Sequence, residues 1–389
     1  MLAPDALTGL IDATRNDVLS VAADIDPAKP EHQDEPPAWL IWLRTTLSAL
    51  VDGLQPSDRR TVRTLADRVL AFVEHERPRG RGLAIFAAPD LWRTHILPVP
   101  LRGRVTYGRP DVLPLLWAAD EYEPYAVLAV NKERARLLVA YLGAATVVED
   151  DVLELDPGTW RFTSGRPPTF IRRAGMAASR GIQRDTFEAR VEEHHRRLWR
   201  AAAEAAAQWL QETRVERLII AGPEEAASET RRLLPEAARQ RLIAVVAAPP
   251  DLDTVEIHRA TQPVALREER ARELALVDDI LTRATGRAGA VVGPAAVVGA
   301  LAKKNVLVLA ADRDVAGDVL TCEACGHVTV PPADRCPACG GALQRGSFGQ
   351  MLPLLARRAA ARLELVDGEA AARLRLHGGV GARLRYSVL

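Results

Sequence analysis

Four cysteines are the clearest chemistry-bearing residues of this 389-residue chain, and all of them occupy one window. Cys322 and Cys325 form one C-x-x-C pair, and Cys336 and Cys339 form a second, with ten residues between the pairs. Two such knuckles, each followed by a glycine that lets the backbone turn, predict a tetrahedral thiolate site for one zinc ion. Four thiolates leave no open coordination position, so we expect a structural and not a catalytic ion.

Two disulfides or four free thiols are the alternatives to zinc. The N-terminal segment has no basic region followed by an apolar run, which is the mark of an export signal. Disulfides are rare in proteins that stay in a reducing compartment, so this feature favours zinc.

A second candidate site is the stretch AASRGIQRDT at residues 177–186, a small and basic tip around Gly181-Ile182-Gln183. Residues 157–200 contain ten arginines and four acidic residues, although the 51 basic and 51 acidic residues of the whole chain cancel. Arginine forms bidentate contacts with phosphate, so this region predicts RNA binding. A solvated helix face next to a disordered loop is the alternative. The candidate RNA-binding residues are Arg172, Arg173, Arg180 and Arg184.

Other motifs in the chain do not predict catalysis. His194 and His195 follow two glutamates, but the order is not that of an H-E-x-x-H zinc site, and we expect the pair to face solvent. The segment GPAAVVGALAKKN lacks the Gly-Lys-[Ser/Thr] of a phosphate loop and predicts the start of a packed helix. We find no Ser-His-Asp set, carboxylate dyad or dinucleotide fingerprint.

The composition is that of a globular protein, with 48% hydrophobic and 26% charged residues. A net charge of zero excludes a basic footprint over the whole molecule, so nucleic-acid contacts have to come from local patches. No apolar stretch is long enough to cross a membrane. We expect a cytoplasmic monomer with no membrane partner.

The periodicity of apolar residues predicts an α/β protein of the multi-domain α+β kind. The first 77 residues are mostly helical in pattern, and strands are expected at 82–88, 95–100 and 104–108. A meander of three strands follows from residue 125, then a long aperiodic loop, and then a helix over about 184–213.

A strand, a helix and a strand after that long helix form a βαβ unit, so the middle sheet is expected to be mixed. The last part begins with a helix at residues 265–285 and continues with a helix over 289–305 and a strand at 306–312. These patterns predict three domains, at 1–120, 121–255 and 256–389, with a zinc ribbon inserted at 320–345.

Several segments together resemble a known superfamily. HGGVGARLRY at the C-terminus is similar to the ending of archaeal and eukaryotic class-1 peptide release factors and of Pelota. RLIIAGPEEA resembles the strand-Gly-Pro-helix turn of their middle domain, and the zinc knuckles resemble the metal ribbon of archaeal members. The four features keep their order over residues 122–389. The resemblance is best to the bacterial archaeo-eukaryotic release factors, a family that includes Balon-like hibernation factors.

The resemblance gives the basic tip a function. GIQRDTFEARVEEHHRRL stands where release factors carry a GGQ loop that leads into a long helix. The glutamine of that loop places a water against the ester of peptidyl-tRNA, so Gly181 and Gln183 are the implied catalytic residues. Ile182 departs from the motif, because a β-branched residue stands where the second glycine belongs and disfavours positive φ.

The function expected from this departure is a ribosome-associated factor that enters the ribosomal A site in rescue or hibernation. The first 120 residues contain no NIKS-type tetrapeptide, so we expect no stop-codon reading. Peptidyl-tRNA hydrolysis by Gly181-Ile182-Gln183 is the alternative, and a generic RNA-binding protein with a zinc ribbon is a third hypothesis. The implied partners are ribosomal RNA, tRNA and a translational GTPase.

Overall fold

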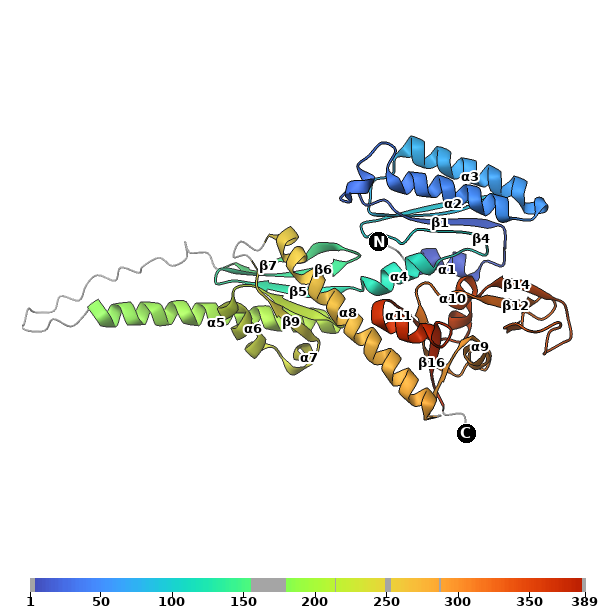
Figure 1. The fold of residues 1–389 in the computed structure, drawn as a ribbon. Coiled ribbons are helices and arrows are strands. Elements are labelled where there is room, and N and C mark those ends of the chain that lie inside the picture. Colours follow the sequence, from blue (N-terminus) through green and yellow to red (C-terminus); the bar gives the residue numbers. More distant parts are fainter. Residues whose placement is uncertain (1–3, 155–179, 214, 249–252, 287, 387–389) are drawn as a thin grey trace, which may run out of the picture. The chain divides into compact units, whose positions relative to one another are not determined.

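The computed structural model describes the backbone of residues 4–154, 180–213, 215–248, 253–286 and 288–386. The chain forms two compact units. The first unit comprises Met1–Glu123 and Glu268–Leu389, and the middle unit is Pro124–Arg267. Both units combine helices with sheets (Figure 1), which confirms the α/β fold class. The three-domain division remains a prediction beside these two units.

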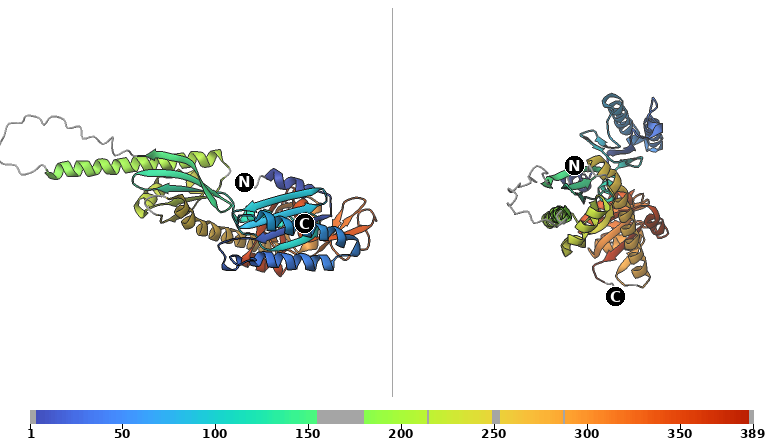
Figure 2. Two further views of the ribbon diagram at one scale, coloured as in Figure 1. Left: turned by 90° about the horizontal axis from the view of Figure 1, so that it is seen from above. Right: turned by 90° about the vertical axis from the view of Figure 1, so that its left-hand side faces the viewer.

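The N-terminal part of the first unit is an antiparallel sheet in the order β3-β2-β1-β4. Two long helices, α2 and α3, lie side by side over one face of this sheet (Figures 1 and 2). The elements are α1 (Pro4–Asp12), β1 (Val18–Asp24), η1 (Pro30–His32), α2 (Ala38–Gly53), α3 (Pro56–Glu76), β2 (Gly82–Ala88), β3 (Leu91–Leu97), β4 (Arg104–Gly108) and α4 (Leu113–Glu121).

The expectation of a helical N-terminus was wrong at β1, whose sequence VLSVAAD forms a central strand. Six of its seven residues are buried. A strand that is covered on both faces has no alternation of apolar and polar residues, so its sequence cannot be distinguished from a buried helix. The strand expected at 95–100 begins earlier, at Leu91.

The middle unit contains a mixed five-stranded sheet in the order β7-β6-β5-β8-β9. Strands β5, β6 and β7 are antiparallel, and β8 and β9 join β5 in parallel, which confirms the predicted meander and βαβ unit. The elements are β5 (Tyr125–Val130), β6 (Arg134–Tyr141), β7 (Ala144–Glu154), α5 (Arg180–Glu212), β8 (Leu218–Ala221), α6 (Glu224–Leu233), α7 (Glu236–Arg239) and β9 (Leu242–Val246).

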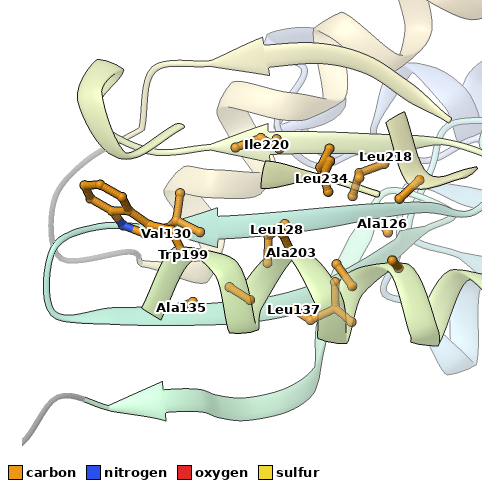
Figure 3. Packing of buried hydrophobic residues seen from close by; sticks show 14 of the residues in the cluster. Ala126, Leu128, Val130, Ala135, Leu137, Trp199, Ala203, Leu218, Ile220 and Leu234 are labelled. Carbon is orange, nitrogen blue, oxygen red and sulfur yellow. The ribbon is translucent and has the colours of Figure 1, made fainter. Parts of the chain in front are cut away.

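The second half of α5 packs on this sheet (Figure 3). Small side chains on the helix, such as Ala203, allow it to approach the apolar residues Leu128, Leu137 and Ile220 of three neighbouring strands. All four of these residues are fully buried. The sheet is therefore a rigid base for α5.

Gly222 shows why the turn after β8 requires glycine. A Cβ atom at this position would lie 2.1 Å from the carbonyl oxygen of Val130 at the end of β5. No side chain fits at that distance. The strand-Gly-Pro-helix turn is thus a close approach of two backbones within the middle unit.

The C-terminal part of the first unit has a sheet in the order β10-β16-β11-β15 and a separate ribbon in the order β13-β12-β14. The elements are α8 (Thr254–Thr285), β10 (Ala290–Val292), α9 (Pro294–Ala302), β11 (Val306–Asp312), β12 (Asp318–Cys322), β13 (Val328–Thr329), β14 (Leu343–Ser347), α10 (Phe348–Arg358), β15 (Arg362–Val366), α11 (Gly368–Arg375) and β16 (Val380–Leu384).

Two helix predictions in this part were wrong at their starts. α8 begins at Thr254, eleven residues before the predicted start, and keeps Pro263 inside the helix. Residues 290–292, expected to be helical, form β10, and the helix begins only after Gly293, which has a φ of 88°. That positive φ is accessible to glycine and separates strand from helix.

The two parts of the first unit are joined by specific contacts. The guanidinium of Arg313 lies 3.5 Å from the centre of the Trp117 ring on α4. Arg357 pairs with Asp12 at 2.8 Å, and Arg102 pairs with Asp314. Residues from both ends of the sequence therefore stabilise one compact body.

Candidate functional site

The four cysteines lie at the tip of the β12–β14 ribbon and form one cluster. Their sulfur atoms lie within 4.8 Å of one another. The Sγ–Sγ distances are 3.4 Å for Cys322–Cys339, 3.4 Å for Cys325–Cys339 and 3.6 Å for Cys325–Cys336. A tetrahedron of sulfurs about 2.3 Å from zinc has edges of about 3.8 Å, whereas a disulfide requires about 2.05 Å. The geometry fits one zinc ion and excludes disulfides among these four.

The two knuckles have the same backbone geometry. The N–H of Gly326 donates to the carbonyl of Cys322 at 2.9 Å, and the N–H of Gly340 donates to the carbonyl of Cys336 at 2.8 Å. Both glycines have positive φ values, 70° and 74°. Each C-x-x-C-G segment is therefore a turn that needs glycine in its last position, as the sequence predicted.

The four thiols differ in burial and influence one another's pKa values. Cys322 and Cys336 are buried, while Cys325 and Cys339 are exposed. The backbone N–H of Cys325 donates to the sulfur of Cys322 and lowers the pKa of Cys322 to about 6. For Cys325, the hydrogen bonds with Cys339 and Cys322 outweigh the backbone N–H of His327 and raise the pKa to about 12. These cysteines hold one structural zinc ion.

The basic tip is placed differently from the prediction. α5 begins at Arg180 and not at residue 184, so Gly181-Ile182-Gln183 belongs to the first turn of this 33-residue helix. Arg184 lies in the second turn. Arg172 and Arg173 lie outside the described residues. Whether these four arginines bind RNA and whether Gln183 is catalytic remain predictions.

The first half of α5 extends beyond the sheet as an arm (Figure 1). From residue 191 on, the first buried residue of the helix is Leu198. It lies fifteen positions after Gln183, and at 1.5 Å per residue this is about 22 Å of helix. The tripeptide thus lies at the N-terminal end of α5, about 22 Å along the helix from Leu198.

A hydrogen bond fixes the base of the arm. The indole Nε1–H of Trp199 donates to the carbonyl oxygen of Asn131, in the turn between β5 and β6, at 2.8 Å. His195 packs on the Trp199 ring with 5.7 Å between ring centres, and burial lowers its pKa. The solvent-facing histidine pair was therefore a wrong expectation, because His194 and His195 are both partly buried.

Sequence reasoning did not find Trp199 or Asn131. A tryptophan next to charged residues on a long helix was the available signal, but its partner lies 68 positions away in the chain. Arg196, Arg197 and Arg200 are exposed next to this anchor. Arg197 pairs with Glu193 at 3.2 Å, so part of this charge is compensated.

Known proteins resemble two parts of this chain. Residues 110–266 match the family model of bacterial archaeo-eukaryotic release factor family 10, and residues 320–344 match the ChsH2 rubredoxin-like zinc ribbon domain. No curated protein matches the chain. The first match includes the whole arm and the sheet beneath it, and the second includes all four cysteines.

Solved structures give further similarities. The archaeal translation termination factor aRF1 is 16% identical, with 98% of this chain and 96% of that chain covered and a TM-score of 0.27. Pelota from Archaeoglobus fulgidus is 14% identical, with 79% and 80% covered and a TM-score of 0.35. S. cerevisiae Dom34, a translation termination-like factor, is 12% identical, with 81% and 77% covered and a TM-score of 0.41.

The family match covers the arm-bearing middle unit, so this unit is similar to the corresponding part of the bacterial archaeo-eukaryotic release factors of family 10. The described residues contain no helix that is long and apolar enough to span a membrane.

Proposed function

We propose that this protein enters the A site of the bacterial ribosome without reading a stop codon and acts in ribosome rescue or hibernation. One observation carries the proposal. Gly181-Ile182-Gln183 stands in place of the GGQ tripeptide of release factors and lies at the N-terminal end of a helical arm, about 22 Å along the helix from its first buried residue, Leu198. An arm of this kind suits a narrow RNA-lined site.

The helical conformation of the tripeptide argues against hydrolysis. A helix holds φ near −63°, so residue 182 does not have the positive φ that a second glycine would permit. The β-branched Ile182 restricts this backbone further. We infer that Gln183 occupies the site and does not place a hydrolytic water.

The start of α5 also suits contact with RNA phosphates. The first four N–H groups of a helix have no partner inside the helix, and the helix dipole gives that end a partial positive charge. Arg180 and Arg184 add two full charges in the first two turns. This combination favours phosphate binding at the end of the arm.

Peptidyl-tRNA hydrolysis is the second candidate, since Gly181 and Gln183 match the release-factor motif. A release assay separates the two functions. Purified protein is added to 70S ribosomes with labelled peptidyl-tRNA in the P site and an empty A site. The proposal predicts firm co-sedimentation with ribosomes and peptide release at the background rate. Efficient release that Gln183→Ala abolishes would establish the hydrolase instead.

The proposed partners are ribosomal RNA and tRNA, with a translational GTPase as the delivery factor. Cryo-EM of ribosomes that co-purify with the tagged protein tests all three. Density for α5 in the peptidyl-transferase centre supports the proposal, and density at a site outside the A site contradicts it. Classification by tRNA occupancy distinguishes rescue, with a P-site tRNA, from hibernation on empty ribosomes.

A further inference from the structure

We propose that an ionic cluster on α4, α8 and β15 is a proton-linked clamp at the point where the chain passes between its two compact units. The chain leaves the first unit after Glu123 and returns to it at Glu268. Charged residues at the end of the outgoing segment, up to Glu123, contact charged residues at the start of the returning segment, from Glu268 on. All of them belong to the first unit.

Two arginines of α8 connect the outgoing segment to the returning segment. Arg270 pairs with Glu121, which lies at the end of α4. Arg272 contacts Glu123 at 3.4 Å and also Glu269 at 3.3 Å. The outgoing and returning segments are thereby held together on the side of the first unit.

The cluster also covers the open edge of β15. Among the strands that the structure describes, β15 pairs with β11 alone, and its outer N–H groups need other acceptors. The N–H of Leu365 donates to Oδ2 of Asp120 at 2.8 Å, and the N–H of Asp367 donates to Oε2 of Glu273 at 3.2 Å. Carboxylates from α4 and α8 thus replace a missing neighbouring strand.

Negative charge exceeds positive charge in this cluster. Six carboxyl groups face three guanidinium groups, and Glu269, Glu273 and Glu364 are only 2%, 3% and 6% exposed. Burial disfavours the charged form of these groups and the neighbouring carboxylates repel one another, so the closed cluster retains protons. Asp367, at the rim, pairs instead with Arg313 at 2.7 Å. The six carboxyl groups are those of Asp120, Glu121, Glu123, Glu269, Glu273 and Glu364, and the three cations are Arg270, Arg272 and Arg362.

The direction of the pH effect follows from this proton binding. Burial outweighs the neighbouring Arg270 and raises the pKa of Glu273 to about 7, and burial together with Glu364 raises the pKa of Asp120 well above its usual range. Opening the clamp returns these groups to ordinary values and releases their protons. The clamp is therefore tightest in acid and weakens as the pH rises from about 4.5 to about 7.

Hydrogen exchange measures the clamp directly, because two of its bonds are made by backbone amides. Exchange of peptides covering 362–367 is recorded by mass spectrometry on the full chain with zinc, at pH 5, 6, 7 and 8, and corrected for intrinsic exchange. We expect protection to fall at least about tenfold between pH 5 and 7.5 and to level off above that range. Peptides from β5 serve as an internal reference that should not change. Protection of 362–367 that does not depend on pH overturns the proposal.

Variants of the cluster test whether its carboxyl groups cause the pH dependence of exchange protection. Glu273→Gln keeps an acceptor for the Asp367 amide and Asp120→Asn keeps one for the Leu365 amide, but neither side chain can ionise, so each variant should reduce the pH dependence at least about threefold. Glu369→Gln is the matched control, because Glu369 pairs with Arg373 outside the cluster and should leave the wild-type profile unchanged. An unaltered profile in both cluster variants, or a flattened one in the control, contradicts the clamp.

Discussion

The zinc ribbon and the α5 arm are the two parts of the molecule that carry chemistry, and they are built in opposite ways. The ribbon brings its four ligands together within 18 residues, and local turns at Gly326 and Gly340 set their positions. The arm has its tripeptide about 22 Å along the helix from its first buried residue, Leu198, and its base is fixed by a distant part of the sequence, at Asn131. Spacing defines the first site, and tertiary packing defines the second.

Removal of zinc should have the largest effect and should remain confined to the ribbon. Binding of structural zinc contributes on the order of 10 kcal/mol at neutral pH, which a three-stranded ribbon cannot replace. Cys336→Ser should therefore lose the metal and unfold residues 318–347, while exchange protection of β5 and β8 stays at the wild-type level. Elemental analysis of the wild type should give about one zinc per chain.

Two controls define the zinc result. His327→Ser changes the one potential zinc ligand that directly follows the first knuckle, and this variant should keep the metal because four thiolates complete the site. Metal-free wild-type protein with two native disulfides would contradict the zinc site.

A change at the base of the arm should have an intermediate effect. Trp199→Phe removes the donor to Asn131 and part of a buried ring, which should lower the free energy of unfolding of the middle unit by about 1–3 kcal/mol. Urea unfolding followed by hydrogen exchange of β5 and β6 measures this. Trp209→Phe on the same helix is the control, and it should cost less because Trp209 is only partly buried. Equal costs would mean that the hydrogen bond does not fix the arm.

The comparison also explains what sequence alone could predict. The zinc ligands and the strands at 82–88 and 306–312 were predicted as they are, because a motif or a short apolar run determines them locally. β1 was missed because a strand that is buried on both faces shows no alternation of apolar and polar residues. The start of α8 was missed because Pro263 and the preceding turn residues resemble a loop. The Trp199–Asn131 bond joins distant residues, and no local pattern predicts it.

The arginines at the end of the arm should affect ribosome binding mainly through its salt dependence. Changing Arg172, Arg173, Arg180 and Arg184 to Ala should weaken co-sedimentation with 70S ribosomes. Each lost phosphate contact should reduce the slope of log K against log salt by about 0.7–0.9. Binding measured over a series of salt concentrations gives this slope.

A matched pair tests whether position matters beyond charge. Arg180→Ala with Arg184→Ala should reduce the slope, whereas Arg60→Ala with Arg63→Ala, on the exposed face of α3, should not. Equal slopes of log K against log salt for the two double variants would show that the arm does not contact RNA.

The smallest expected effect is also the one that separates the two functions of the arm. Ile182→Gly restores the release-factor tripeptide and removes the β-branch that stiffens the first turn of α5. Glycine in a helix costs about 1 kcal/mol, which frays this turn and opens the positive φ values that a water-placing glutamine requires. We expect a weak release of peptide by Ile182→Gly from stalled ribosomes on which the wild type is inactive. Ile182→Ala is the control, because it removes the β-branch but keeps the turn helical, and it should remain inactive. Release by Ile182→Ala as well would show that side-chain bulk, and not backbone conformation, prevents hydrolysis at the end of the arm.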